Sequence, residues 1–364
     1  MSIMVKALGK ASRAMTMLKR ARLSVRQLKA QRSEFYIDLW NRAAEEVGAA
    51  VEDSRGELLT ISRGESIARV FRNYTDLDGP VTLRAAGNKP LVHKTLRAQG
   101  LPTPDYLQFS LKKMPAAIDF LKLHGECVIK PAANTGAGEG VTTNVATRAQ
   151  LNRAAIAAAG YGSELLIEEQ ISGVNARLLY LDGVLLDAVQ RCPPVIVGDG
   201  RSTIGQLVRQ TNKHRIQNGY SVAQTTLKYD LDAKRTLDGQ GLSWRSVPAE
   251  GQPITLKTVV NDNAAAENVS VTDQVAESVV EVGRRAARAI GVRLAGVDIV
   301  TPDLGSDLES VGGVVLEVNT TPGLYIHEGG QGGPVAASIL EACLALSRQN
   351  LTRQDDEAFA AVME

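Results

Sequence analysis

Hydrophobic and polar positions follow two different spacings along this chain. Apolar residues recur at helical spacing in five segments, 34–47, 90–99, 115–124, 150–159 and 275–290. Short apolar runs between turn residues predict strands at 58–61, 67–71, 127–131, 165–168, 295–300 and 314–318. Two further runs, 177–181 and 184–190, flank Asp182-Gly183, a strong hairpin signal. This mixed order favours an α+β fold over a parallel doubly wound sheet.

The first 33 residues join a helical pattern to a basic charge. They contain nine Lys or Arg residues and no acid, and apolar residues from Leu8 to Leu28 fall at roughly helical spacing. A helix whose apolar face packs on the protein or on a second subunit fits best, and a homodimer formed in this way is one arrangement that the sequence permits. A helix on an anionic membrane surface and a disordered arm are the alternatives.

These patterns divide the chain into four parts. We expect a helical and α/β unit at 1–87, a subdomain with a Gly-rich loop at 88–185, a second subdomain at 186–348 and a frayed acidic tail at 349–364. The length of 364 residues suits several packed subdomains better than one small core.

Composition narrows the class of protein. A net charge of +1 provides no field to attract nucleic acid, and no apolar run approaches the roughly 20 residues that span a bilayer. The three cysteines are too few and too scattered for a disulfide framework or a zinc site, which favours a reducing cytoplasm.

A Gly-rich loop follows the strand at 127–131. It starts at Asn134 and places Gly136, Gly138 and Gly140 at alternate positions, where backbone amides can approach a polyanion such as the phosphates of ATP. A flexible surface loop is the alternative. The pattern is neither a P-loop nor a dinucleotide-binding fingerprint.

Two lysines bracket this loop in the sequence. Lys89 begins a predicted helix and Lys130 ends an apolar strand. Because an unpaired buried charge costs several kcal/mol, Lys130 needs an anionic partner if it is buried, and a phosphate is one such partner. A solvated side chain or a salt bridge is the alternative for either lysine. Lys94, one turn after Lys89, is expected to be solvated.

Two acidic residues stand inside apolar strands near the C-terminal end. Asp298 and Glu317 would lie side by side if their strands form a hairpin, and Asn319 would share their face by strand alternation. Two carboxylates and an amide oxygen form a hard-oxygen site suited to Mg²⁺. The alternative is that Arg residues or backbone amides satisfy these acids.

Other polar residues give weaker signals. Arg177 and Arg191 lie on the predicted hairpin and can hold a phosphate or a carboxylate, or form surface ion pairs. His327 follows a Pro-Gly turn and could line a site, although a lone histidine is more often structural. No nucleophilic triad is evident.

Together these elements resemble the ATP-grasp superfamily and, within it, the nucleotide domain of cyanophycin synthetase. The resemblance runs from about Asn88 to about Gly333. Its diagnostic motifs are Val195-Ile196-Val197-Gly198-Asp199-Gly200 with Thr203-Ile204, Ser246-Val247-Pro248, and Glu317-Val318-Asn319 with Pro322-Gly323. It implies two α+β subdomains that sandwich ATP, preceded by a small N-terminal unit.

The resemblance also assigns roles to single residues. It implies that Lys89 and Lys130 hold the ATP phosphates, that the loop from Asn134 closes over them, and that Arg177 and Arg191 lie near the transferred phosphate. The residues that it places at the adenine hinge and the ribose are Glu168, Glu169, Gln170, Ile171 and Asn175. The magnesium ligands would be Asp298, Glu317 and Asn319, with Mn²⁺ as an alternative ion.

The sequence departs from the family pattern at three places. Asn175 stands where many members have an acid for the ribose, and residues 262–266 replace a Ser-Thr-Gly-Gly turn. The second ligase domain of cyanophycin synthetase does not follow before Glu364, so synthesis of that polymer by this chain alone is not expected.

The resemblance implies an ATP-dependent carboxylate–amine ligase. The γ-phosphoryl group would pass to a carboxylate, and an amine, from an amino acid or small peptide, would attack the acylphosphate to form an amide. A nucleotide-binding regulatory module without turnover is one alternative, and a kinase or carboxylase is another.

Overall fold

The computed structural model describes residues 24–133, 135, 138–218, 225–264, 267–328 and 334–347. Residues 1–23 of the predicted basic helix and the predicted tail at 349–364 therefore lie outside the described residues. Within the described ranges, no helix is long and apolar enough to cross a lipid bilayer.

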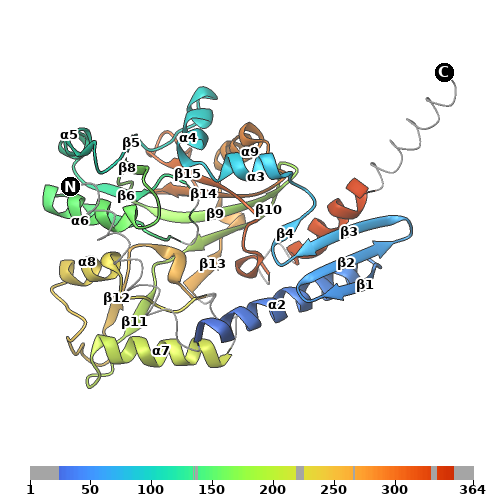
Figure 1. Ribbon diagram of the computed structural model, residues 1–364, viewed down its shortest axis with the longest axis horizontal. Coiled ribbons are helices and arrows are strands. Elements are labelled where there is room, and N and C mark those ends of the chain that lie inside the picture. Colours follow the sequence, from blue (N-terminus) through green and yellow to red (C-terminus); the bar gives the residue numbers. More distant parts are fainter. Residues whose placement is uncertain are drawn as a thin grey trace.

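The N-terminal unit is a long helix packed on a four-stranded antiparallel sheet. Helix α2 (Ser24–Glu46) precedes β1 (Ala50–Arg55), β2 (Leu58–Arg63), β3 (Ser66–Phe71) and β4 (Tyr74–Thr75), which pair in this order. Tyr36, Leu39 and Trp40 of α2 are buried in the core of this unit, which a helix at 335–347 completes. Figure 1 places the unit at one end of the molecule.

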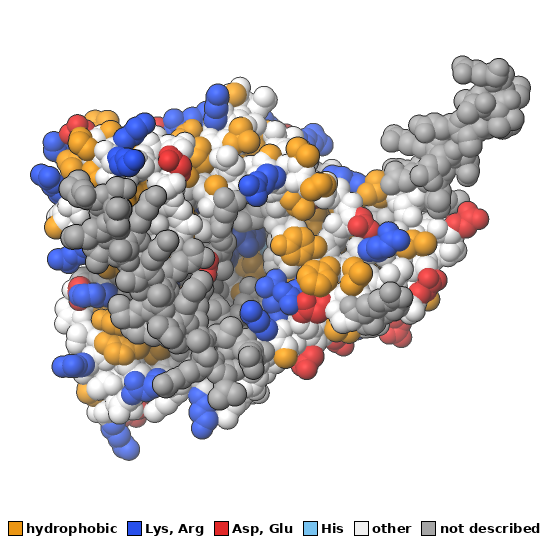
Figure 2. All heavy atoms as spheres, viewed as in Figure 1, with side chains coloured by type: hydrophobic (Ala, Val, Ile, Leu, Met, Phe, Trp, Pro, Cys, Tyr) orange, Lys and Arg blue, Asp and Glu red, His pale blue; other side chains and the backbone are white. Residues whose placement is uncertain are grey.

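The outer surface of this unit carries some apolar side chains. Figure 2 shows hydrophobic side chains over its strands, interspersed with charged ones. Strand β3 alternates buried and exposed positions, as a strand with one covered face should. The exposed apolar residues on β2 to β4 are Leu58, Ile67, Phe71 and Tyr74.

A second four-stranded sheet carries the Gly-rich loop and is called the loop sheet. It has the order β5-β8-β6-β7, formed by β5 (Tyr106–Phe109), β8 (Leu165–Glu169), β6 (Cys127–Pro131) and β7 (Thr142–Val145). Helices α5 (Met114–His124) and α6 (Arg148–Ala159) pack their apolar faces on it around Ile129, Leu151 and Ile167. The loop joins β6 to β7.

A five-stranded antiparallel sheet forms the centre of the molecule (Figure 1). Its order is β13-β10-β9-β14-β15, from β13 (Asn268–Ser270), β10 (Val184–Arg191), β9 (Val174–Leu181), β14 (Leu294–Thr301) and β15 (Val314–Thr320). Helices α3 (Pro80–Ala86), α4 (Lys89–Ala98) and α9 (Glu277–Ile290) cover one face, against Leu178, Val297 and Ile299. The opposite face is left for polar residues along part of its length.

The five-stranded sheet bears on two predictions. The hairpin expected at 177–190 is confirmed as β9 and β10, and the two strands that carry the acids pair as β14 and β15. The predicted subdomain boundary between residues 185 and 186 falls inside the β9–β10 hairpin, whose strands share one sheet. The division into four parts remains a prediction.

The described residues between 192 and 267 form a small layer of their own, called the insertion. It contains β11 (Val195–Val197), α7 (Ile204–Asn218), α8 (Leu231–Gly239), β12 (Pro253–Thr255) and the turn η1 (Val260–Asp262). Its own core gathers Ile196, Leu207 and Ile254. Two further short helical turns among the described residues are η3 (Thr272–Gln274) and η4 (Leu324–Ile326).

The diagnostic Gly-Asp-Gly motif has a structural role in this insertion. Asp199 Oδ1 accepts hydrogen bonds from the N–H groups of Arg201 (2.9 Å) and Ser202 (2.6 Å), and these donors lower the pKa of the Asp199 carboxyl to about 2. At Gly198 a Cβ atom would lie 2.1 Å from the Ala249 carbonyl oxygen, so only glycine fits. Thr203 then begins α7 by capping Gln206 N–H.

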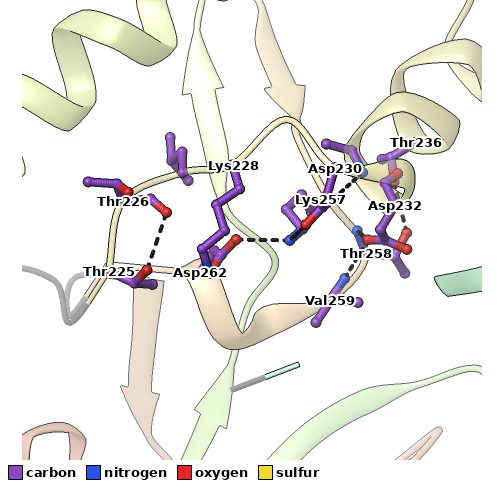
Figure 3. A network of polar contacts seen from close by, with 12 residues as sticks. Thr225, Thr226, Lys228, Asp230, Asp232, Thr236, Lys257, Thr258, Val259 and Asp262 are labelled. Carbon is purple, nitrogen blue, oxygen red and sulfur yellow. Dashed lines mark hydrogen bonds and ion pairs between the residues drawn. The ribbon is translucent and has the colours of Figure 1, made fainter. Parts of the chain in front are cut away.

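Buried charges hold the insertion together (Figure 3). Lys257 is 3% exposed, and its Nζ lies 2.6 Å from Asp230 and 2.8 Å from Asp262, which also pairs with Lys228 at 2.8 Å. Although burial opposes ionisation, the two lysines hold the pKa of the Asp262 carboxyl below its ordinary range. Asp262, the first residue of the segment 262–266 that departs from the family pattern, is therefore bound by two lysines, Lys257 and Lys228.

Asp232 connects the insertion to the loop sheet. Its Oδ1 accepts hydrogen bonds from the N–H (3.1 Å) and hydroxyl (2.7 Å) of Thr143 on β7, and its Oδ2 from the N–H groups of Thr258 (3.0 Å) and Val259 (3.1 Å). A carboxylate with four donors is well compensated for burial. One residue of α8 thus ties β7, next to the Gly-rich loop, to the segment that follows β12.

Candidate nucleotide and metal site

The polar face of the five-stranded sheet gathers most of the predicted site residues. In the strand pairing, Arg177 lies opposite both Val189 and Asp298, Asp298 lies opposite Glu317, and Asn175 lies opposite Arg191. Because side chains alternate along a strand, these residues point away from the face that α4 and α9 cover. The hairpin that the sequence required for Asp298 and Glu317 is confirmed.

Asp298 is held by arginines. Arg177 donates Nε–H and Nη2–H to its two carboxylate oxygens at 2.7 Å each, and Nη1 of Arg191 lies 3.9 Å away. Burial opposes ionisation of Asp298, but the guanidinium of Arg177 holds its pKa below the ordinary value. The alternative in which an arginine satisfies the buried acid therefore applies to Asp298.

The two arginines are not equivalent. Burial and the positive charge of Arg177 lower the pKa of Arg191 to about 10, so it stays protonated at neutral pH. Burial also disfavours the charged form of Arg177, but the bond to Asp298 outweighs it and raises its pKa. Gly296 lies beside this pair, and a Cβ there would be 3.1 Å from Pro322 Cβ and in van der Waals contact with Arg177 Cδ at 3.4 Å.

Glu317 and Asn319 leave oxygen atoms for a cation. The side chain of Glu317 is 32% exposed, and its nearest charged partner, Lys89 Nζ, is 3.7 Å from Oε1. Asn319 uses its Nδ2 to donate to Gly296 O (3.2 Å) and Asp298 Oδ2 (3.3 Å), which turns its Oδ1 away from both. A carboxylate and an amide oxygen on one strand face suit Mg²⁺, whereas the Asp298 oxygens already have arginine and amide partners.

The start of α4 places Lys89 next to Glu317 on β15. Asn88 caps the helix by accepting a hydrogen bond from Leu91 N–H (3.2 Å) and forms a β-bridge with Ala133. Lys89 N–H donates to Ala132 O at 3.2 Å, so the helix begins beside the end of β6. Lys89 is 9% exposed, while Lys94 on the same helix is exposed, as predicted.

Lys130 has a protein partner in this structure. Its Nζ lies 2.7 Å from Glu168 Oε2, and His93 Nε2 lies 2.9 Å from Glu168 Oε1. Burial opposes ionisation of Glu168, but Lys130 and His93 outweigh it and lower its pKa to about 2. The His93 ring also stacks on Tyr106 at 4.9 Å between ring centroids. Glu168 thus fixes Lys130 at the end of β6.

The predicted hinge residues differ in the partners of their backbone N–H groups. The N–H groups of Glu169 and Gln170 donate to the carbonyls of Asp105 and Glu126, both at 3.0 Å. Among the described residues, Ile171 is the first hinge residue whose N–H has no backbone partner. Asn175, further along, has a buried Oδ1 without a hydrogen-bond partner in the described part of the chain.

The Gly-rich loop is described in part. Asn134 and Gly136 lie outside the described residues, so their predicted roles stay predictions. Gly138 and Gly140 adopt positive φ angles of 68° and 75°. A Cβ on Gly140 would lie 2.8 Å from the ring of Tyr161 and 2.9 Å from Pro131, so the loop returns close to the end of β6.

His327 forms a second buried acid–imidazole pair, with Asp187 on the polar face of the five-stranded sheet. Its Nδ1 lies 2.7 Å from Asp187 Oδ2, and both side chains are fully buried. Burial, together with the charges of Arg177 and Arg191, lowers the pKa of His327 despite the opposing effect of Asp187. His327 Nε2 has no hydrogen-bond partner among the described residues.

Sequence reasoning missed three residues of this region. His93 follows Lys89 by four positions, so helical spacing alone places it on the same buried face of α4. Asp187 stands in an apolar strand, which is the signal that identified Asp298. Tyr325 is half-buried near Arg191, and no local pattern marks it.

Comparisons with known proteins agree with this architecture. The chain is 28% identical over 290 residues to cyanophycin synthetase from Trichormus variabilis, which covers 78% of this chain and 32% of that protein. It is 28% identical over 284 residues to the glutathione biosynthesis bifunctional protein GshAB of Clostridium perfringens, over 76% and 36% of the two chains. No family model matches it.

A solved structure supports the same fold. A bifunctional glutathione synthetase from Pasteurella multocida aligns with a TM-score of 0.53 and 23% identity, over 82% of this chain and 41% of that chain. The sheets and the site together define an ATP-grasp fold, which confirms the predicted α+β class. Within that class the chain resembles cyanophycin synthetase, as its motifs predicted, and it spans about a third of the length of these curated relatives.

Proposed function

We propose that this chain is an ATP-dependent ligase that joins a carboxylate to an amine through an acylphosphate. The observation that carries the proposal is the convergence of Lys89 with Glu317 and Asn319 on the polar face of the five-stranded sheet. A lysine next to free carboxylate and amide oxygens provides both a direct contact for phosphate and a position for the cation that accompanies it.

ATP would bind between the loop sheet and the five-stranded sheet. Lys89 and Lys130 would contact its phosphates, and Gly138 and Gly140 would let the loop backbone approach them. The open Ile171 N–H can donate to the adenine ring, and the buried Asn175 Oδ1 can accept from a ribose hydroxyl. Asn134 and Gly136 complete the predicted loop, and Glu168 would act by positioning Lys130.

Magnesium fits the oxygen atoms on β15. Glu317 and the Oδ1 of Asn319 would hold it, with Asp298 beside them, and Mn²⁺ is an alternative ion. When bound, the ion would neutralise negative charge on the ATP phosphates. Arg177 would keep Asp298 ionised and in place, because the pair is bidentate.

Arg191 is the cationic side chain best placed for the transferred group. It stays charged although it is 7% exposed, and it lies on the strand next to Arg177. The acid substrate is a poor electrophile until the γ-phosphoryl group reaches its oxygen, which gives a leaving group that an amine can displace. Donors that stabilise the oxyanion formed in that attack are worth roughly 3 kcal/mol each.

The proposal extends to substrates and location. We infer that the acid and the amine are amino acids or small peptides, which the similarity to cyanophycin synthetase and to a glutathione biosynthesis protein supports. Cytoplasmic location and a homodimer stay predictions. A non-catalytic nucleotide-binding module remains the competing function, because Lys130 is already paired with Glu168 in this structure.

A turnover assay separates the two functions. The protein is incubated with ATP, Mg²⁺ and a mixture of amino acids, and ADP and new amide masses are measured. The ligase proposal predicts ADP and an amide in equal amounts, both lost in Glu317→Ala. ATP binding by calorimetry without ADP formation above the Glu317→Ala background, with any acid–amine pair, would favour the regulatory module.

A further inference from the structure

Amide formation also requires a group that removes a proton from the amine, and the site described so far has no residue for this step. An α-amino group has a pKa of about 8, so at neutral pH it is mostly ammonium and has no lone pair for attack. A ligase therefore gains from a neutral base near the amine. Lys89, Lys130 and the arginines are cationic, and Asp298 is bound by Arg177.

The Asp187–His327 pair has the arrangement that such a base requires. Ala188 N–H donates to Thr272 Oγ1 at 2.9 Å, so the Thr272 hydroxyl directs its own hydrogen to Asp187 Oδ1, also at 2.9 Å. Ser270 Oγ lies 3.3 Å from the same oxygen. Asp187 is thus supplied with donors as a carboxylate, and its Oδ2 accepts from His327 Nδ1–H. That tautomer leaves a lone pair on Nε2.

The strand pairing places this pair on the proposed ligase site face. Asp187 and Arg191 are four residues apart on β10 and point to the same side, about 13 Å apart along the strand at roughly 3.3 Å per residue. Arg177 lies on the neighbouring strand, opposite Val189 between them. Because His327 is hydrogen-bonded to Asp187, its imidazole lies on the same side of the sheet as both arginines, whose positive charges help to lower its pKa.

The other three histidines lie elsewhere and do not share the position of His327 beside the polar face of the five-stranded sheet. His93 donates Nε2–H to the carboxylate of Glu168 on β8, His124 lies 3.7 Å from Glu169, and His214 is exposed on α7. Nε2 of His327, like Nδ1 of His93, is buried without a hydrogen-bond partner in the described part of the chain. Of the two, His327 is the one whose carboxylate partner, Asp187, lies on the polar face of the five-stranded sheet with Arg177 and Arg191.

We propose that His327, oriented by Asp187, accepts the proton of the amine substrate. This inference rests on the proposed ligase function. The ammonium gives one proton to Nε2, and the nitrogen lone pair then forms the C–N bond to the acyl carbon. The C–O bond to phosphate breaks, and phosphate leaves with that electron pair. The second proton of the nitrogen leaves with phosphate, and His327 returns its proton to solvent.

Hydroxylamine separates this step from acylphosphate formation. It is a nucleophile that is already neutral at neutral pH, so it traps an acylphosphate as the hydroxamate without needing a base. In His327→Asn, the side-chain N–H can replace Nδ1–H toward Asp187 while the Nε2 lone pair is lost. We expect amide formation to fall about a hundredfold, the effect of one general base. Hydroxamate formation should stay within about threefold of the wild type, because it bypasses that base.

His93→Asn is the matched control, since His93 is the other fully buried histidine with a carboxylate partner. It should lower hydroxamate and amide together, because Glu168 and Lys130 act before the acylphosphate forms. Equal loss of both products in His327→Asn, or no loss of either, would contradict the proposal that His327 is the base. A wild-type chain that forms neither product would instead overturn the ligase function, and the base with it.

The wild-type pH profile tests the base even if His327→Asn does not fold. The groups that face His327 are Asp187 and Arg191 from β10 and Arg177 from β9. Burial lowers the pKa of His327 below its ordinary value of 6.5, so it stays a neutral base down to that lower pKa. At saturating amine, kcat should stay level as the pH falls from the pKa of the amine to that of His327. A kcat that falls in proportion to the neutral amine throughout would overturn the proposal.

Discussion

At the scale of single residues, the site depends on how each charge is paired. Lys130 and Asp298 are both buried, and each has a protein partner at 2.7 Å, while Lys89 and Glu317 lie 3.7 Å apart and the Glu317 side chain is 32% exposed. A bound phosphate can therefore compete for Lys89 at a lower cost than for Lys130. Lys89 should be the more sensitive residue for ATP.

Two lysines of α4 provide a matched pair for this prediction. Lys89→Met should lower kcat/KM for ATP about a hundredfold, since one charge-assisted contact of roughly 2–3 kcal/mol is lost. Lys94→Met removes the same charge from the exposed face of the helix and should change kcat/KM by less than about twofold. Steady-state kinetics with varied ATP measures both. Equal losses in the two variants would contradict a contact between Lys89 and phosphate.

The lowered pKa of Glu168 should make the free energy of unfolding depend on pH. Its folded pKa is lowered from 4.5 to about 2, so its contribution is complete above pH 4.5 and is lost as the pH falls through about 2. Glu168→Gln leaves Lys130 buried without its partner and should cost roughly 3–5 kcal/mol at neutral pH. The difference between variant and wild type should shrink steadily below pH 4.5.

Urea unfolding at a series of pH values checks this. Glu164→Gln is the control, because Glu164 is exposed at the start of the same strand region and should shift stability by less than about 0.5 kcal/mol. A Glu168→Gln penalty that is the same at neutral and acidic pH would show that the Lys130 pair is not its origin.

At the scale of elements, the turn between the two sheets is the most constrained connection. Gly173 has φ 144°, and a Cβ there would lie 2.3 Å from the Thr301 carbonyl oxygen. The chain therefore passes from β8 to β9 against the end of β14, which fixes Asn175 and Arg177 at the start of the polar face. No side chain fits this passage without moving backbone.

Gly173→Ala should accordingly destabilise the protein by roughly 2–4 kcal/mol, the combined cost of a strained backbone and an added atom in a packed contact. Gly162→Ala serves as the control, since nothing lies within 4 Å of its Cβ position and it has no positive φ. The midpoint of thermal unfolding reports the difference. A Gly173→Ala protein with the midpoint of the wild type would mean that the passage is wider than in this structure.

The elements also explain how much the sequence could predict. Asp298, Glu317 and Asn319 were identifiable because a carboxylate in an apolar strand is rare without a function or a partner. The pairing of Asp298 with Arg177 depends on which strands are neighbours, and β9 and β14 are separated by more than a hundred residues. The insertion escaped prediction for a similar reason, since its short strands and buried ions such as Lys257 and Asp262 are stabilised by distant partners.

At the scale of the whole molecule, three layers meet around the proposed ATP site. The five-stranded sheet provides the charged face, the loop sheet provides Lys130 and the Gly-rich loop, and the insertion reaches the loop sheet through Asp232. Arg235 on the same helix also donates to the carbonyls of Thr143 and Asn144. Because α8 is hydrogen-bonded to β7 next to the Gly-rich loop, we expect the insertion and the loop sheet to move together when substrates bind.

The transfer of oxygen from the carboxylate to phosphate tests the central claim most directly. The chain is incubated with ATP, Mg²⁺ and amino acids whose carboxyl oxygens are ¹⁸O, and the released phosphate is analysed by mass spectrometry. An acylphosphate route predicts one ¹⁸O atom in each phosphate, in an amount equal to the amide, and neither product from Glu317→Ala. Amide and ADP formed with unlabelled phosphate would contradict the acylphosphate, and no ADP above the Glu317→Ala level would contradict the ligase itself.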